Sequence, residues 1–263
     1  MNNILTMPAM NFAYSSPLDQ FEVTNLISIN APILGYLNLS LTNLGLYSLI
    51  VLTLILSFHW VTLNNNKIIP SKWNISLETF FASINSMVRD QIGSANEIYF
   101  PFIYSLFLFI IISNLIGNIP YNFTIPTSAI VSIGASFTIF IGVTILAVSI
   151  HKLGFFSFFV PDGTPLALVP LLVWIELVSY CARAVSLGVR LFANMTAGHT
   201  LIKILSTFLA QMFASGGIFS ILTLIPFSIF IALIGLEVAV SIIQAYVFCI
   251  LTSSYLKDAI YLH

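Results

Sequence analysis

The chain of 263 residues is 59% hydrophobic and only 6% charged, whereas a soluble domain carries about 25% charged residues. No residue from Ile98 to Ile150 is charged, and one crossing of a bilayer needs only about 20 apolar residues. The composition therefore excludes an ordinary soluble protein and predicts an integral membrane protein with several spans. A net charge of -1 without a basic cluster also excludes the electrostatic footprint of a nucleic-acid-binding protein.

Residues 1–40 combine prolines and asparagines with short apolar pieces, a pattern that favours a non-spanning surface segment. The first fifteen residues contain no lysine or arginine, so they lack the basic region of a secretory signal and the arginines of a transit peptide. Residues 41–61 form the first predicted span, which reaches about 31 Å at the rise of an α-helix.

Apolar side chains return at helical spacing between residues 75 and 92, with polar and charged side chains on the opposite face. This pattern predicts an amphipathic helix that lies along the membrane surface and serves for packing or docking. Two further spans are expected over residues 99–119 and 127–150. Asn114 lies inside the first of them, where an interhelical hydrogen bond is favoured over a place in an ion path.

The lysines and arginines of the short loops set the expected orientation, because these residues accumulate on the inner side of a membrane. The N-terminal segment and the turn near Pro120 have none. Basic residues instead follow the first span, the third span and the last helix: Lys67, Lys72, Arg89, Lys152 and Lys257. Five crossings then place the N-terminus outside and the C-terminus inside.

The last two helical runs are too long for upright spans. They cover residues 165–209 and 218–258, with a turn at Gly216-Gly217 and a bend expected at Pro226. A run of roughly 40 residues makes a helix of about 60 Å, twice the thickness of the hydrocarbon core. The sequence therefore predicts an all-α membrane protein with five membrane helices and one amphipathic surface helix. The last two membrane helices are expected to be long, antiparallel and steeply tilted.

Both long helices carry a stripe of polar side chains within otherwise apolar runs. Residues seven apart share a helix face, with a drift of about 20° per heptad. The stripe of the first long helix consists of Glu176, Arg183, Arg190 and Asn194. The stripe of the second consists of Glu237, Ser241 and Gln244. An arginine at mid-bilayer costs about 2.5–3.5 kcal/mol, so such residues mark functional sites.

A hairpin that sets Arg190 opposite Gln244 separates the titratable residues into two groups, one toward the inner side and one toward the outer side. The inner group is Glu176 and Asp258, and the outer group is His199 and Glu237. Glutamate and histidine can exchange protons, whereas arginine keeps its proton. Arg190 is therefore interpreted as a fixed cation between two proton paths. No carboxylate of this chain matches its level, which predicts a partner in another subunit. For Arg183, an ion pair inside the bundle and a functional role are both open.

These residues resemble subunit a of the F-type ATP synthase, in its fungal mitochondrially encoded form. The resemblance is carried by Gly163–Leu166, Ala184–Leu191, Ala197–His199, Glu237 with Ile243–Tyr246, and the ending Ser254–His263. It runs from about Ser16 to the last residue. Ser16–Glu22 looks like the start of the mature fungal subunit, which would make residues 1–15 a removed leader and residues 16–263 a single membrane domain.

The resemblance implies that Arg190 faces a ring of small proteolipid subunits, each with a mid-membrane carboxylate, and that Gln244 lies beside it. Asn194, one turn further along the stripe, is expected in the proton path as well. It assigns His199 and Glu237 to an outer proton half-channel, and Glu176 and Asp258 to an inner one. It also implies contacts with other membrane-sector and peripheral-stalk subunits in the mitochondrial inner membrane. The N-terminus would face the intermembrane space and the C-terminus the matrix. No cofactor, metal or direct nucleotide contact is expected, since no glycine-rich phosphate loop occurs.

Three other classes fit the sequence less well. A self-contained transporter favours an inverted repeat with discontinuous helices, which is not visible in the sequence. A haem-binding respiratory subunit needs suitably placed membrane histidines, and only His199 lies within a span. A purely structural subunit leaves the ionisable residues in lipid unexplained.

Overall fold

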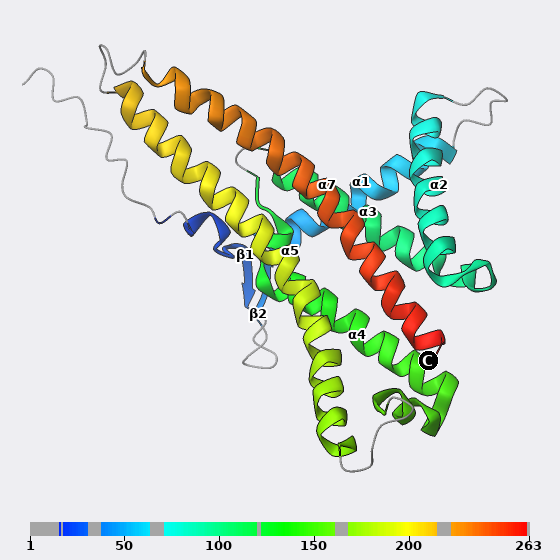
Figure 1. Cartoon of the computed structure of the whole chain (residues 1–263). Helices are drawn as coiled ribbons and strands as arrows, with labels where there is room; N and C mark the ends of the chain where they lie inside the picture. Colours follow the sequence, from blue (N-terminus) through cyan, green and yellow to red (C-terminus); the bar gives the residue numbers. More distant parts are fainter. Residues whose placement is uncertain are drawn as a thin grey trace, which may run out of the picture.

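A computed structural model describes residues 16, 18–30, 38–63, 71–119, 122–160, 168–214 and 222–261. Within these ranges, six α-helices make up most of the chain (Figure 1). They are α1 Asn43–Leu63, α2 Lys72–Ile92, α3 Phe100–Gly117, α4 Ala129–His151, α5 Val169–Ala214 and α7 Leu224–Ile260. The short 3-10 helices are η1 Asp19–Phe21, η3 Ser94–Tyr99, η4 Ile125–Thr127 and η5 Lys152–Phe159. The expected leader over residues 1–15, Pro165 and the expected turn at Gly216-Gly217 lie outside the described residues.

Five helices of the described chain are long and apolar enough to cross a membrane, namely α1, α3, α4, α5 and α7. This confirms the predicted all-α membrane protein with five membrane helices. The N-terminal region adds a short antiparallel ribbon that was not predicted, β1 Asn25–Asn30 paired with β2 Asn38–Thr42. Polar and apolar residues alternate along β2, which is the period of a strand. The ribbon moves the start of the first span from residue 41 to Asn43.

The amphipathic segment forms α2, which begins three residues before the predicted start. The Ser71 hydroxyl caps the helix by accepting a hydrogen bond from the Asn74 N–H at 3.4 Å. The helix ends at Gly93, whose φ of 92° lies in the left-handed region where glycine is favoured. One face is buried against α3 and α7 through Ile84, Met87, Val88 and Ile92. The predicted packing role is thus confirmed, and the position along a membrane surface stays a prediction.

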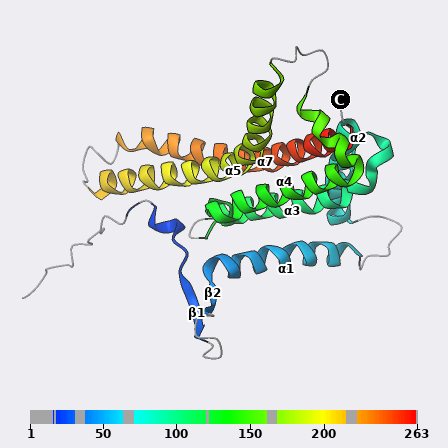
Figure 2. The same cartoon turned by 90° about the horizontal axis from the view of Figure 1, so that it is seen from below.

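Helices α5 and α7 run antiparallel and side by side, as the sequence predicted (Figures 1 and 2). The first part of α5 turns sharply away from α7 in Figure 2, so the two helices are paired only over the later part of α5. Pro226, where a bend was expected, lies in the first turn of α7, where the missing N–H costs little. The steep tilt of both helices relative to a membrane stays a prediction.

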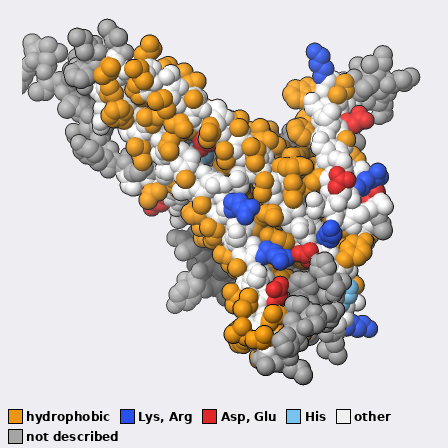
Figure 3. All heavy atoms as spheres, in the orientation of Figure 1, with side chains coloured by type: hydrophobic (Ala, Val, Ile, Leu, Met, Phe, Trp, Pro, Cys, Tyr) orange, Lys and Arg blue, Asp and Glu red, His pale blue; other side chains and the backbone are white. Residues whose placement is uncertain are grey.

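The buried core lies where α2, α3, α4 and the C-terminal half of α7 meet, and it includes the fully buried Val88, Ile103 and Cys249. The far part of the α5–α7 hairpin carries an exposed apolar surface (Figure 3). Charged side chains on this face lie over the centre of the molecule and along the side where α2 lies. A continuous apolar exterior of this kind suits a lipid environment or contact with other membrane helices.

The close crossing of α4 and α5 determines the direction in which the arginine stripe of α5 faces. At Gly188, a Cβ atom would lie only 2.9 Å from the Ile133 Cα and from the Ser132 carbonyl oxygen of α4, so glycine allows the two backbones to approach. Leu187 and Leu191 are buried on the same side of α5. Arg190 is therefore directed away from α4, and its side chain is exposed.

Candidate functional site

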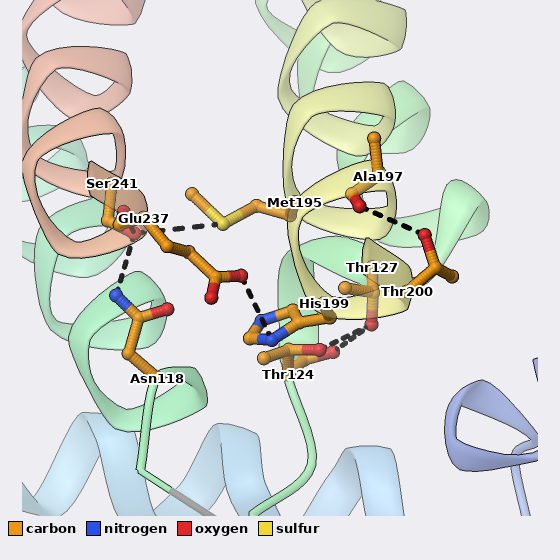
Figure 4. A network of polar contacts seen from close by, with 9 residues as sticks. All are labelled: Asn118, Thr124, Thr127, Met195, Ala197, His199, Thr200, Glu237 and Ser241. Carbon is orange, nitrogen blue, oxygen red and sulfur yellow. Dashed lines mark hydrogen bonds and ion pairs between the residues drawn. The ribbon is translucent and has the colours of Figure 1, made fainter. Parts of the chain in front are cut away.

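The predicted outer group forms one contact between the two long helices, which is an ion pair when His199 is protonated. His199 Nδ1 on α5 lies 3.1 Å from Glu237 Oε1 on α7, and the side chains are only 14% and 10% exposed. Figure 4 shows the Glu237 carboxylate directed toward the imidazole ring. The contact depends on Gly198, because a Cβ atom there would lie 2.8 Å from the same carboxylate oxygen. The structure thus brings together two of the predicted site residues.

Two asparagines, Asn114 of α3 and Asn118 directly after it, bind Ser241 of α7 next to Glu237. Asn114 Nδ2 donates to the Ser241 carbonyl oxygen at 3.0 Å, and Asn118 Nδ2 donates to the Ser241 hydroxyl at 2.8 Å. The same hydroxyl donates to the Glu237 carbonyl oxygen at 2.8 Å (Figure 4). The interhelical hydrogen bond expected for Asn114 is confirmed. Asn118 was missed, because its place in Gly117–Pro120 suggested only the end of a helix.

Several buried polar atoms of the residues in and near this contact have no hydrogen-bond partner. Five of the six such side-chain atoms in the described chain are Asn114 Oδ1, Asn118 Oδ1, Thr196 Oγ1, His199 Nε2 and Glu237 Oε1, the last of which contacts His199 Nδ1 without forming a hydrogen bond. Buried polar groups in proteins are normally satisfied by protein or by ordered water. Acceptors and a ring nitrogen in this arrangement are able to hold water molecules and to pass protons between them. Thr196, which follows Phe192 by one helical turn, was not identified as a candidate site residue from the sequence.

Glu237 also borders a groove of about 370 Å³ between α5 and α7. Asn194 and Gln244 line the same groove, so the structure brings three of the predicted residues to one surface. The remaining lining is apolar apart from Gly198, and it includes Met195, Leu201 and Leu236. Asn194 stands one helical turn from Arg190 on α5. The groove therefore connects the outer ion pair with the neighbourhood of the arginine.

Arg190 has an exposed side chain on α5 and forms no ion pair with any residue that the structure describes. The same helix carries an apolar groove of about 670 Å³ lined by Leu177, Val178, Cys181, Ala182, Val185, Ser186 and Val189. The expectation that its partner belongs to another subunit stays a prediction. A guanidinium at the edge of an apolar helix face is costly in lipid unless an anion meets it.

One residue of the predicted inner group has an ion-pair partner within this chain. Asp258 Oδ2 on α7 lies 2.6 Å from Arg183 Nη1 on α5, so the ion pair that was one of the two alternatives for Arg183 is present. Glu176 forms no ion pair within the described ranges. It belongs to the first part of α5, which turns away from α7 in Figure 2. Arg183 is thus the ion-pair partner of Asp258, and an inner group of Glu176 and Asp258 stays a prediction.

Comparison with known proteins places these residues in a family. A family model described as ATP synthase A chain matches residues 45–257. ATP synthase subunit a of Mycosarcoma maydis is 66% identical over 254 residues, which cover 97% of this chain and 100% of the relative. The subunit a of Emericella nidulans is 51% identical over 94% of this chain and 97% of the relative, and that of Kluyveromyces lactis is 48% identical over 97% and 100%. The chain therefore belongs to the ATP synthase A chain family.

Proposed function

We propose that this chain is the stator subunit of the membrane sector of an F-type ATP synthase, where it couples proton translocation to rotation of a subunit ring. Support comes from the family and from its fungal relatives named ATP synthase subunit a. The observation that carries the mechanism is Arg190, an arginine on an exposed apolar helix that has no ion-pair partner among the described residues. The proposed partner is the mid-membrane carboxylate of a small proteolipid subunit in the ring.

The outer half-channel is proposed to contain His199 and Glu237. Their contact of 3.1 Å and their low exposure support this role, because protons pass between groups within hydrogen-bond reach. The unpartnered atoms of Asn114, Asn118 and Thr196 extend the polar surface around the pair. The adjoining groove with Asn194 and Gln244 leads from Glu237 toward Arg190. A proton entering from outside would reach a ring carboxylate along this surface and neutralise it.

The inner half-channel is proposed to contain Glu176 and Asp258. The neutral ring carboxyl can face lipid while the ring turns, and it releases its proton into this inner half-channel after nearly a full turn. Arg190 favours the release because it stabilises the ionised form of the ring carboxyl. The same guanidinium keeps its own proton, so it blocks direct passage between the half-channels. One charge that crosses the membrane potential supplies about 2.3 kcal/mol per 100 mV, so several protons must be coupled to each costly product.

The proposed location is the mitochondrial inner membrane, with the N-terminus toward the intermembrane space and the C-terminus toward the matrix. The fungal relatives and the five apolar helices support a multi-pass mitochondrial protein, and the distribution of lysine and arginine supports the orientation. The subunit is proposed to contact the ring, other membrane-sector subunits and the peripheral stalk, without binding nucleotide or performing the catalytic step itself. Removal of residues 1–15 as a leader belongs to the same proposal.

The substitution Arg190→Ala tests this function in the whole ATP synthase reconstituted in liposomes. ATP-driven proton pumping should be abolished, since no fixed cation then separates the half-channels, while the amount of assembled subunit stays normal. Arg89→Ala is the matched control, because Arg89 is an exposed arginine of α2 that pairs with Glu97. Normal coupled pumping by the Arg190→Ala enzyme would refute the mechanism.

A further inference from the structure

Three side chains that we call the inner clamp join α5 to α7: Arg183, Tyr255 and Asp258. The Arg183 guanidinium forms an ion pair with Asp258 at 2.6 Å. Its Cζ atom also lies 5.4 Å from the centroid of the Tyr255 ring, within the range of a cation–π contact. The Tyr255 hydroxyl donates to the Arg183 carbonyl oxygen at 3.4 Å. Both the side chain and the backbone of α5 are therefore held at this turn.

The geometry of α7 explains why the clamp forms. Tyr255 and Asp258 are three residues apart, so they lie on the same face of the helix. That face meets α5 at Arg183, which contacts both side chains. The Arg183 and Asp258 side chains are 31% and 32% exposed, so the pair is partly shielded from solvent. In such surroundings the loss of one partner leaves the other as an unpaired charge.

Arg190 lies between two interhelical ion pairs. The inner clamp is seven residues before it on α5, about 10 Å along the helix, and His199 with its partner Glu237 is nine residues after it, about 14 Å along. Throughout the described chain, these are the two ion pairs that join α5 to α7. A shift or rotation of α5 against α7 would move Arg190 relative to the ring, and each pair resists such a shift.

We propose that Arg183 is a positioning residue: its ion pair with Asp258 keeps α5 in place on α7, so that Arg190 stays opposite the ring carboxylate. Coupling then requires the charge of Asp258 as an anchor, and proton release on the inner side depends on Glu176. This inference rests on the proposed function of Arg190. It divides the two inner carboxylates into one anchor and one proton carrier.

A charge swap tests the clamp in the whole ATP synthase in liposomes. Arg183→Asp and Asp258→Arg each place two like charges together, and each should lower ATP-driven proton pumping by about tenfold per assembled enzyme. The double variant re-forms the ion pair with opposite polarity and should recover to within about threefold of the wild type. The same three changes at the exposed pair of Arg89 and Glu97 are the matched control, and they should leave pumping unchanged.

A second set of variants decides the question without reversing the charges. Arg183→Gln with Asp258→Asn removes both charges but keeps two groups able to hydrogen-bond, so it should pump faster than Asp258→Asn alone. The proposal is overturned if the swapped enzyme assembles in normal amount yet pumps no faster than the single variants. It is overturned equally if the neutral double variant is no better than Asp258→Asn, the result expected of a proton carrier. The Arg190→Ala enzyme, measured in parallel, distinguishes failure of the clamp from failure of the proposed function. Active pumping by that enzyme would contradict the proposed function of Arg190 itself.

Discussion

Gly198 offers a sharp test of the outer half-channel, because a single added methyl group acts directly on the His199–Glu237 pair. In Gly198→Ala, the new Cβ atom would lie 2.8 Å from Glu237 Oε1 and 3.3 Å from its Cδ. Ordinary contacts begin at 3.4 Å, so the carboxylate has to move by about 0.6 Å or rotate away. The oxygen that must move is the same one that contacts His199 at 3.1 Å.

The expected result is a loss of proton flux with little loss of stability. A misplacement of about 1 Å costs on the order of 100-fold in reactions that depend on position, so a shift of about 0.6 Å should slow proton pumping roughly tenfold. The helix itself gains about 0.5–1 kcal/mol from replacing glycine by alanine, and the displaced group is the end of a flexible side chain. Assembly of the subunit should therefore be normal.

ATP-driven acidification of liposomes, measured with a pH-sensitive dye and normalised to ATP hydrolysis, would report the effect. Gly235→Ala is the matched control, because Gly235 lies two residues from Glu237 on the same helix and a Cβ atom there meets nothing within 4 Å. The reasoning is wrong if Gly198→Ala pumps at the wild-type rate. It is also wrong if Gly235→Ala slows pumping to the same extent.

Two further substitutions address the proton path and the fold. Glu237→Gln keeps the shape of the side chain but cannot carry a proton, so proton flux in liposomes should fall far more than the amount of assembled enzyme; an unchanged flux would count against the half-channel. Gly188→Ala forces apart the backbones of α4 and α5, because the Cβ atom would lie 2.9 Å from Ile133 Cα and from the Ser132 carbonyl. It should destabilise the subunit by about 1–3 kcal/mol, measured as a lower temperature of dissociation from the complex, and undiminished thermal stability would contradict this.

Of the two asparagines that bind α7, the sequence pattern identified one and missed the other. Asn114 was recognised because a strongly polar group inside an apolar run needs a partner. Asn118 sits at the end of the helix, where a polar residue is ordinary, yet its amide reaches the Ser241 hydroxyl. Only the position of α7 beside α3 shows that both amides bind the same residue.

The amino-acid sequence was sufficient for those features that depend on local composition and on helical period. The lengths of the apolar runs predicted the five membrane helices, because each run must satisfy its backbone inside lipid as a helix. Heptad spacing put Glu176, Arg183 and Arg190 on one stripe, and the absence of a carboxylate at the level of Arg190 pointed to another subunit. The alternation along residues 38–42 was too short a signal for the β-ribbon, since pairing with residues 25–30 is a contact between separate segments.

The tertiary structure decided which charged groups meet. Helical spacing treats α5 as straight, and on a straight helix Glu176 and Asp258 share one level. In the structure α5 is bent (Figure 2), and Arg183 lies beside Asp258 at 2.6 Å. Likewise, Gly198 has no charge to attract notice, yet it lets Glu237 reach His199. Ion pairs form across distances of a few ångströms, and the bends and close approaches that set such distances arise from packing among helices far apart in the sequence.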